Sequence, residues 1–424
     1  MSKQNKNYYY NSISADIDIE KYDFLLTNIN GILFDYSDHH LSNKPDLKKS
    51  LKILIRTKFF WLLYLRNKLS KWNKGENIIL SNAYVNIYQE KYTTMLPPWI
   101  FSPSKNTFCS LKLIKIIKKI NDNFKKKSIK ILLSSEFESL INAFKVELSL
   151  LFEEYKVNAL IVPNDLAFFE NLAIKIAKEA KIPTFVYLHG MPGRYNNVDD
   201  NRADYLIVWG KGLKELYVKN GIDEKKILTL KHPIYSSFKE SNLESNLTDI
   251  LVLTKATCGT PSTSTELILT TDRSVVLYYT ELVKQNLKKL GVKKATLRLH
   301  PSEDPDFYVK NLPDNFFTID NCSKEESLAK ASLVIGPTST MLLDALKCNK
   351  NYILFDPVFD GVTLEGMPLV PPFTGESFIK LSNNYDDISY NIKNPSSNIN
   401  FKKLNDFLEI DINDEEKFLN ILNS

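Results

Sequence analysis

The chain has 424 residues, of which 43% are hydrophobic and 25% charged, and its formal net charge is +5. This length exceeds what one ordinary core serves, so we expect two folded domains. No apolar run reaches the ~20 residues of a membrane-spanning helix, and no secretory signal opens the chain. Four scattered cysteines lack metal-ligand spacing and indicate reduced thiols. We therefore expect a cytoplasmic protein.

The first half of the chain alternates short apolar runs with helical patterns. Strands separated by helices of about ten to fifteen residues form right-handed βαβ units with a parallel sheet. The first half therefore predicts a doubly wound α/β domain. Its strands are expected at 31–36, 78–81, 129–133, 160–165, 184–189 and 205–209, and its helices at 138–155 and 170–180.

A polar stretch at 236–249 interrupts this alternation and is the predicted linker. A second set of strands and helices follows, which predicts two Rossmann-like α/β domains facing each other across a cleft. The expected divisions are 1–235, 236–249, 250–400 and a C-terminal helix within 401–424. The second set comprises strands at 250–253, 295–299, 316–319, 333–335 and 352–355, with helices near 277–290, 341–348 and 404–422.

Two ionisable side chains close neighbouring strands of the first domain. Asp165 ends one apolar run, and His189, followed by Gly190, ends the next. Ligands of open α/β sheets bind beyond the carboxyl ends of the strands, so two proton-transfer groups are expected at one rim. The alternatives are that Asp165 caps the helix that follows it and that His189 is structural.

The second domain carries a histidine and a hydroxyl-rich segment at its strand ends. Pro301 favours an extended backbone at His300, which places the imidazole at the strand end. Segment 336–340 precedes a helix, whose free N–H groups and positive dipole end suit a phosphate. A turn histidine and a simple hydroxyl cap are the alternatives. The predicted nucleotide-binding residues are Lys255, His300, Pro301, Gly336, Thr338, Ser339 and Thr340.

Three further features leave alternatives open. His232-Pro233 repeats the His-Pro dipeptide and is interpreted as a hinge or cleft lining. Segment 111–130, with eight lysines, and segment 51–66 could lie on an anionic membrane or form solvated faces. The aspartates near 199 and 304 lack Mg²⁺ spacing, so no metal is expected. No nucleic-acid-binding module is recognisable, and no such partner is expected.

Residues 155–360 resemble bacterial surface-polysaccharide transferases of the GT-B type. Ile161–Asp165 and Lys181–Gly190 resemble their N-domain signature, and Ala203–Gly210 is similar to the segment that follows it. Leu299–Glu303 and Ser339-Thr340 resemble their C-domain His-Pro and Ser-Ser/Thr motifs. Those two motifs also occur in bacterial sialyltransferases and Kdo transferases.

The resemblance implies a metal-independent, inverting glycosyltransferase that needs no cofactor beyond its donor. It would move Kdo or a sialic-type acid from a CMP donor to a surface glycan or glycolipid, with peripheral contact at the inner face of the cytoplasmic membrane. Asp165 would be the general base, with His189 nearby, and His300 would assist the donor phosphate. The alternatives are a CDP-polyol phosphotransferase of teichoic-acid type, a UDP-sugar transferase or epimerase, and a non-catalytic glycan-binding adaptor.

Overall fold

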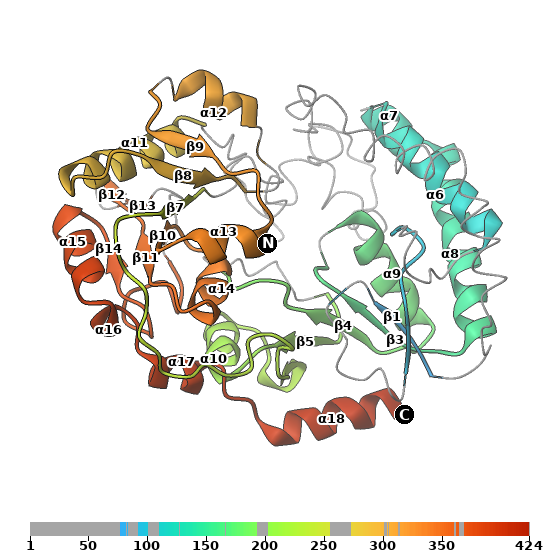
Figure 1. The fold of residues 1–424 in the computed structure, drawn as a ribbon. Coiled ribbons are helices and arrows are strands. Elements are labelled where there is room, and N and C mark those ends of the chain that lie inside the picture. The colour runs from blue at the N-terminus through green and yellow to red at the C-terminus, as the bar shows by residue number, and fades with distance from the viewer. Residues whose placement is uncertain are drawn as a thin grey trace.

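The computed structural model contains two parallel six-stranded sheets, one in each half of the chain (Figure 1). The predicted strand 31–36, segment 51–66, Lys255 and Pro301 lie outside the described residues. The structure describes residues 77–81, 83, 92–100, 110–126, 128–165, 167–192, 202–254, 273–300, 303, 305–312, 314–359, 362–363 and 369–423.

The first sheet has the strand order β2-β1-β3-β4-β5-β6, with every neighbouring pair parallel. The central strands are almost fully buried, as expected for a parallel sheet covered on both faces. The strands are β1 (Ile78–Ser81), β2 (Thr93–Met95), β3 (Val157–Val162), β4 (Thr184–Tyr187), β5 (Tyr205–Val208) and β6 (Ile227–Thr229). The helices are α6 (Leu111–Phe124), α7 (Ile129–Leu132), α8 (Ser135–Tyr155), α9 (Phe168–Glu179) and α10 (Lys211–Lys219).

The prediction of a strand at 129–133 is wrong, because this segment forms the one-turn helix α7. The amides of Ile131, Leu132 and Leu133 bond back to the carbonyls of residues 128 and 129. The segment joins α6 to α8, which lie side by side at the right of Figure 1. The short turn therefore satisfies its backbone locally, although its apolar alternation resembles that of a strand.

The second sheet has the strand order β14-β11-β10-β7-β8-β9, again all parallel. The first strand of this sheet in chain order is β7. Strands β8 and β9 follow on one side of β7, and β10 then pairs with its other side. The carboxyl ends of β7 and β10 thus form a topological switch point, where doubly wound sheets bind ligands. The strands are β7 (Ile250–Leu253), β8 (Ala295–Arg298), β9 (Phe317–Ile319), β10 (Leu333–Gly336), β11 (Tyr352–Phe355) and β14 (Leu381–Ser382).

The remaining elements cover the second sheet and then return to the first. A small hairpin, β12 (Val358–Phe359) with β13 (Val362–Thr363), follows β11. The helices of the second half are α11 (Arg273–Lys289), α12 (Pro305–Asn311), α13 (Lys324–Lys330), α14 (Met341–Lys347), α15 (Tyr385–Lys393), α16 (Pro395–Asn398), α17 (Phe401–Phe407) and α18 (Ile412–Asn423).

The C-terminal segment forms two helices instead of the single one expected over 404–422. The second of them, α18, packs against β3 and β6 of the first sheet and lies along the bottom of Figure 1. Asp414 fixes it there, because its carboxylate accepts from the backbone N–H of Thr229 at 3.0 Å and from the Thr229 hydroxyl at 2.9 Å. The chain end therefore belongs spatially to the first half.

The strands of the two sheets fall on either side of segment 236–249, the predicted linker. Polar contacts tie the crossing to the second half. The Tyr235 hydroxyl donates to Asp344 at 2.8 Å. The side-chain amide of Asn405 accepts the Phe238 N–H and donates to the Phe238 carbonyl, each at 2.9 Å. Gly210 allows the first half to approach α17, because a Cβ there would lie 2.5 Å from the Leu408 backbone. The predicted fold class, two Rossmann-like α/β domains, is confirmed.

Candidate active site

Asp165 lies just beyond β3 and is completely buried. Its carboxylate accepts the backbone N–H of Arg202 and lies 3.7 Å from the Arg202 guanidinium. Asp165 does not cap α9, since Asn164 accepts the N–H of Ala167 at 2.9 Å instead. As placed, Asp165 would have to leave Arg202 before it could meet an acceptor hydroxyl.

His189 follows β4 and is exposed at the same rim. Its Nδ1 lies 2.9 Å from the carbonyl oxygen of Pro163, which follows β3. A carbonyl oxygen only accepts, so Nδ1 carries the proton in this contact, and the neutral ring keeps its lone pair on Nε2. The ring is therefore oriented by one nitrogen and able to accept a proton at the other.

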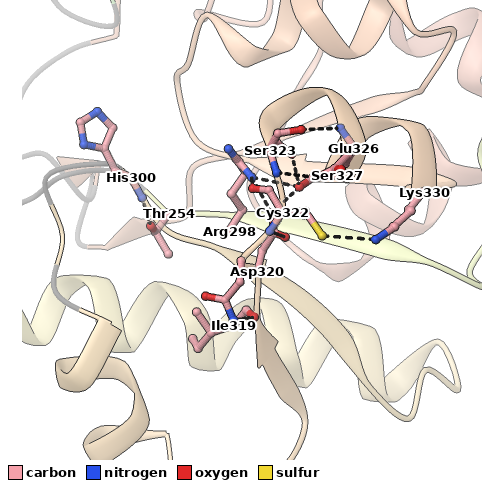
Figure 2. A network of polar contacts seen from close by, with 11 residues as sticks. Thr254, Arg298, His300, Ile319, Asp320, Cys322, Ser323, Glu326, Ser327 and Lys330 are labelled. Carbon is pink, nitrogen blue, oxygen red and sulfur yellow. Dashed lines mark hydrogen bonds and ion pairs between the residues drawn. The ribbon is translucent and has the colours of Figure 1, made fainter. Parts of the chain in front are cut away.

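His300 lies beyond β8, and its side chain is exposed. Its backbone N–H is shared by the Thr254 hydroxyl at 3.1 Å and the Glu303 carboxylate at 2.9 Å. Thr254 directly follows β7, so this contact joins the turn of His300 to the switch-point strand. Figure 2 shows the imidazole pointing away from the polar cluster around Asp320.

The expectation of free N–H groups at the start of α14 is wrong. The Met341 N–H donates to the Ser339 hydroxyl at 3.2 Å, and those of Leu342 and Leu343 donate to the carbonyls of Ser339 and Thr340. Thr340 is the N-cap residue of α14, a helix of only seven residues. The side chains of Ser339 and Thr340 are half-buried, and Thr338 is buried. A phosphate here would be bound by the hydroxyls rather than by the N–H groups of Met341, Leu342 and Leu343.

Gly336 has a packing reason for being glycine. A Cβ at this position would lie 2.3 Å from the Tyr352 hydroxyl. That hydroxyl donates to the carbonyl of Pro337 at 2.6 Å and so fixes the turn that precedes Thr338. The glycine predicted as a ligand contact therefore shapes the loop between β10 and α14.

The two predicted rims touch each other. The Met191 N–H, two residues beyond His189, donates to the Thr340 hydroxyl at 2.9 Å. Gly190 also lies against this hydroxyl, because a Cβ on it would come within 3.1 Å of the Thr340 oxygen. The structure thus brings the segment that follows β4 directly against the segment that follows β10.

Arg298, on β8, belongs to a separate polar cluster (Figure 2). Its guanidinium lies 2.6 Å from Asp320 and 2.9 Å from the Ser327 hydroxyl, and it donates to the Cys322 carbonyl at 3.2 Å. Burial alone would raise the pKa of Asp320, but the hydrogen bonds from Ser327, the Cys322 N–H and Arg298 outweigh it and lower the pKa. This pair holds the β9–α13 turn against β8.

His232, from the other His-Pro dipeptide, is buried at the crossing between the halves. Its ring stacks on Tyr235 and lies 4.4 Å from Trp209, centroid to centroid. Its Nδ1 accepts the backbone N–H groups of Ile234 at 3.1 Å and Tyr235 at 3.3 Å. Burial lowers its pKa to about 4, against an opposing effect of Asp344. This histidine is packed within the crossing.

Three contacts of the site were not foreseen from the sequence. The first is between Asp165 and Arg202, which are 37 residues apart in the sequence. The second is between the Thr254 hydroxyl and the His300 N–H, and the third is between the Pro163 carbonyl and His189 Nδ1. Within the described residues, no group of three or more His, Cys, Asp or Glu side chains is arranged to hold a metal ion. No helix of the described part of the chain is both long and apolar enough to cross a membrane.

Comparison with known proteins finds a likeness only in the general outline of the fold. No protein-family model and no curated protein matches the chain. The solved UDP-GlcNAc 2-epimerase of Methanocaldococcus jannaschii matches with 12% identity over 82% of this chain and 99% of that one, at a TM-score of 0.45.

Two further solved structures match in the same way. The UDP-GlcNAc 2-epimerase of Neisseria meningitidis, bound to UDP-GlcNAc, matches with 11% identity over 82% and 98% of the two chains, at a TM-score of 0.43. MurG of Acinetobacter baumannii matches with 10% identity over 82% and 100%, at 0.41. At these scores the likeness carries no conclusion about function, and the chain is similar to these proteins only as a pair of α/β domains.

Proposed function

We propose that this chain is a nucleotide-sugar-dependent glycosyltransferase that extends a bacterial surface glycan. The observation that carries the proposal is the meeting of two strand-end rims at Met191 and Thr340. One rim presents His189, whose Nε2 can accept a proton. The other presents the exposed His300 beside the switch point and the half-buried hydroxyls of Ser339 and Thr340. Together they supply a base for an acceptor and polar groups for a leaving nucleotide.

The proposed reaction is a single displacement. The acceptor hydroxyl gives its proton to His189 Nε2 while its oxygen bonds to the anomeric carbon. The bond from that carbon to the phosphate oxygen breaks, and the nucleotide leaves with the electron pair. His300 and the hydroxyls of Ser339 and Thr340 would receive the charge that develops on the phosphate. One displacement inverts the anomeric centre.

This proposal moves the base from Asp165 to His189. Asp165 is buried against Arg202, whereas His189 is exposed and already oriented. Asp165 then serves to hold the Arg202 segment beneath the rim. His189→Ala should lower kcat about 100- to 1,000-fold while leaving the KM for donor near its wild-type value. Asp165→Asn should lower the free energy of unfolding and leave the kcat of the folded protein near its wild-type value. A large loss of kcat in a variant of wild-type stability would instead identify Asp165 as the base.

The donor nucleotide is the narrower part of the proposal. A CMP-linked acidic sugar follows from the resemblance of the His-Pro and Ser-Thr segments, and a UDP-sugar transferase or epimerase is the alternative. Nucleotide release from CMP-, CDP-, UDP- and GDP-linked donors, with and without a glycan acceptor, tests both. We expect release that depends on acceptor. A UDP-sugar consumed without acceptor would favour the epimerase, and binding without turnover would favour the adaptor.

We also propose peripheral contact with an anionic membrane through α6. The apolar residues of this helix, from Leu113 to Ile120, are buried against the core, so they are not available for insertion. Its exposed side carries the lysines 112, 115, 118 and 119. Contact would therefore be electrostatic, and flotation with anionic vesicles should be lost at high salt or in a Lys115→Glu/Lys118→Glu/Lys119→Glu variant. Equal flotation with neutral vesicles would contradict it.

A further inference from the structure

The carboxylate of Glu303 lies at the centre of the turn that carries His300. One of its oxygens, Oε2, accepts the His300 N–H at 2.9 Å and also the Thr254 hydroxyl. The Glu303 N–H donates in return to the His300 carbonyl at 2.9 Å. The backbone of His300 is therefore held on both sides by Glu303.

The other oxygen of Glu303 extends the same contact to α12. Oε1 accepts the Tyr308 hydroxyl at 2.6 Å, and Tyr308 is 1% exposed. A single carboxylate thus joins the ends of β7 and β8 to the first helix beyond them. Three donors converge on two acceptor oxygens, a demand that a carboxylate meets and an amide does not.

The environment of Glu303 does not favour its charge. Burial raises the pKa of Glu303, although hydrogen bonds from Thr254, Tyr308 and the His300 N–H act in the opposite direction. An acid whose pKa is raised on folding destabilises the folded state at neutral pH, where the unfolded chain ionises more easily. Ionisation of Glu303 therefore costs folding stability at neutral pH, and two of its three side-chain contacts, those with Thr254 and the His300 N–H, lie at the His300 turn.

We infer that Glu303 is a positioning residue for His300: it fixes the strand-end turn so that the imidazole stays on the donor side of the second sheet. This inference rests on the proposed function, in which His300 contacts the donor phosphate. Thr254 and Tyr308 hold Glu303 in turn. Glu303 itself does not contact the nucleotide.

A double-mutant cycle tests the inference, with UDP, CMP, CDP and GDP as calorimetric probes and thermal unfolding measured alongside. Glu303→Gln replaces one acceptor oxygen by a donor and should weaken nucleotide binding about tenfold, or ~1.4 kcal/mol, in a protein that thermal unfolding shows to be folded at the temperature of the binding measurement. His300→Ala should weaken it further. The double variant should bind no more weakly than His300→Ala alone, because Glu303 acts only through that ring.

Two further variants and a control complete the design. Thr254→Ser keeps the hydroxyl and should bind as the wild type, whereas Thr254→Val should resemble Glu303→Gln. Glu326→Gln is the matched control, because Glu326 also accepts a backbone N–H, that of Ser323, but within the cap of α13. It should leave nucleotide binding unchanged.

The outcomes separate this inference from the proposed function. Wild-type affinity in Glu303→Gln, or losses that multiply in the double variant, would overturn the role of Glu303. Wild-type affinity for all four nucleotides in His300→Ala would overturn the donor site itself. A loss of binding in Thr254→Ser equal to that in Thr254→Val would also count against the clamp, because the hydroxyl is retained.

Discussion

The chain contains two His-Pro dipeptides, and the structure places them in opposite environments. His232 is 2% exposed, packed among aromatic rings, with its own Nδ1 accepting two backbone N–H groups. His300 is exposed. Thr254 and Glu303 hold its backbone N–H, and its ring points away from the polar cluster around Asp320. The same dipeptide therefore serves as internal packing at one strand end and as a candidate ligand group at the other. Burial decides between the two roles.

The largest effect is expected at the buried histidine. His232→Ala removes a packed ring and leaves two backbone N–H groups without their acceptor, which should lower the free energy of unfolding by about 3 kcal/mol. Urea unfolding followed by circular dichroism measures this. Nucleotide affinity of the folded variant should stay at the wild-type level. A variant as stable as the wild type would contradict the packing role.

The exposed histidine should show the reverse pattern. His300→Ala should weaken nucleotide binding about 30-fold, the scale of a hydrogen bond to a charged group. Its unfolding free energy should change by no more than about 0.5 kcal/mol, as for an ordinary surface substitution. Calorimetry and urea unfolding on the same preparation give both numbers. A large loss of stability with unchanged binding would make His300 structural as well.

The buried histidine should also affect the pH dependence of stability. The folded pKa of His232, about 4, lies below its ordinary value of 6.5, because burial disfavours the charged ring. Its contribution to stability is therefore complete above pH 6.5 and is lost as the pH falls towards 4. The free energies of unfolding at pH 7 and pH 5 should differ less in His232→Asn than in the wild type. Equal differences in the wild type and in His232→Asn would be inconsistent with a buried neutral His232.

The smallest effect is expected where the two halves touch. Thr340→Val removes the acceptor of the Met191 N–H and should lower the free energy of unfolding by about 1 kcal/mol. Thr340→Ser retains the hydroxyl and is the matched control. If both variants unfold as the wild type does, the contact contributes nothing to stability.

Most of the fold could be predicted because buried parallel strands are uninterrupted apolar runs. Nearly all predicted strands within the described residues appear within a few residues of their expected bounds. The error at 129–133 arises because a five-residue apolar run fits a helical turn as well as a strand. The edge strands β2, β6 and β14 were missed, since two or three residues are too few to show a period.

The candidate site was predictable only to the level of strand ends. That rule placed His189 and His300 correctly at the rims, because it depends on topology alone. It could not show that Asp165 meets Arg202, since the two are far apart in sequence and the contact depends on tertiary packing. It also could not show that the turn at Ser339 uses the first helix amides internally. Both depend on atomic geometry that residue types do not encode.

The central claim is that a nucleotide binds at the His300 rim, and imidazole NMR tests it directly. The chain has five histidines, so a protein labelled with ¹⁵N-histidine gives few ring signals, assigned by His300→Ala and His232→Asn. Titration with UDP, CMP, CDP and GDP should shift the His300 signals with at least one nucleotide and leave those of His232 unchanged. If none of the four nucleotides moves the His300 signals, the claim is contradicted.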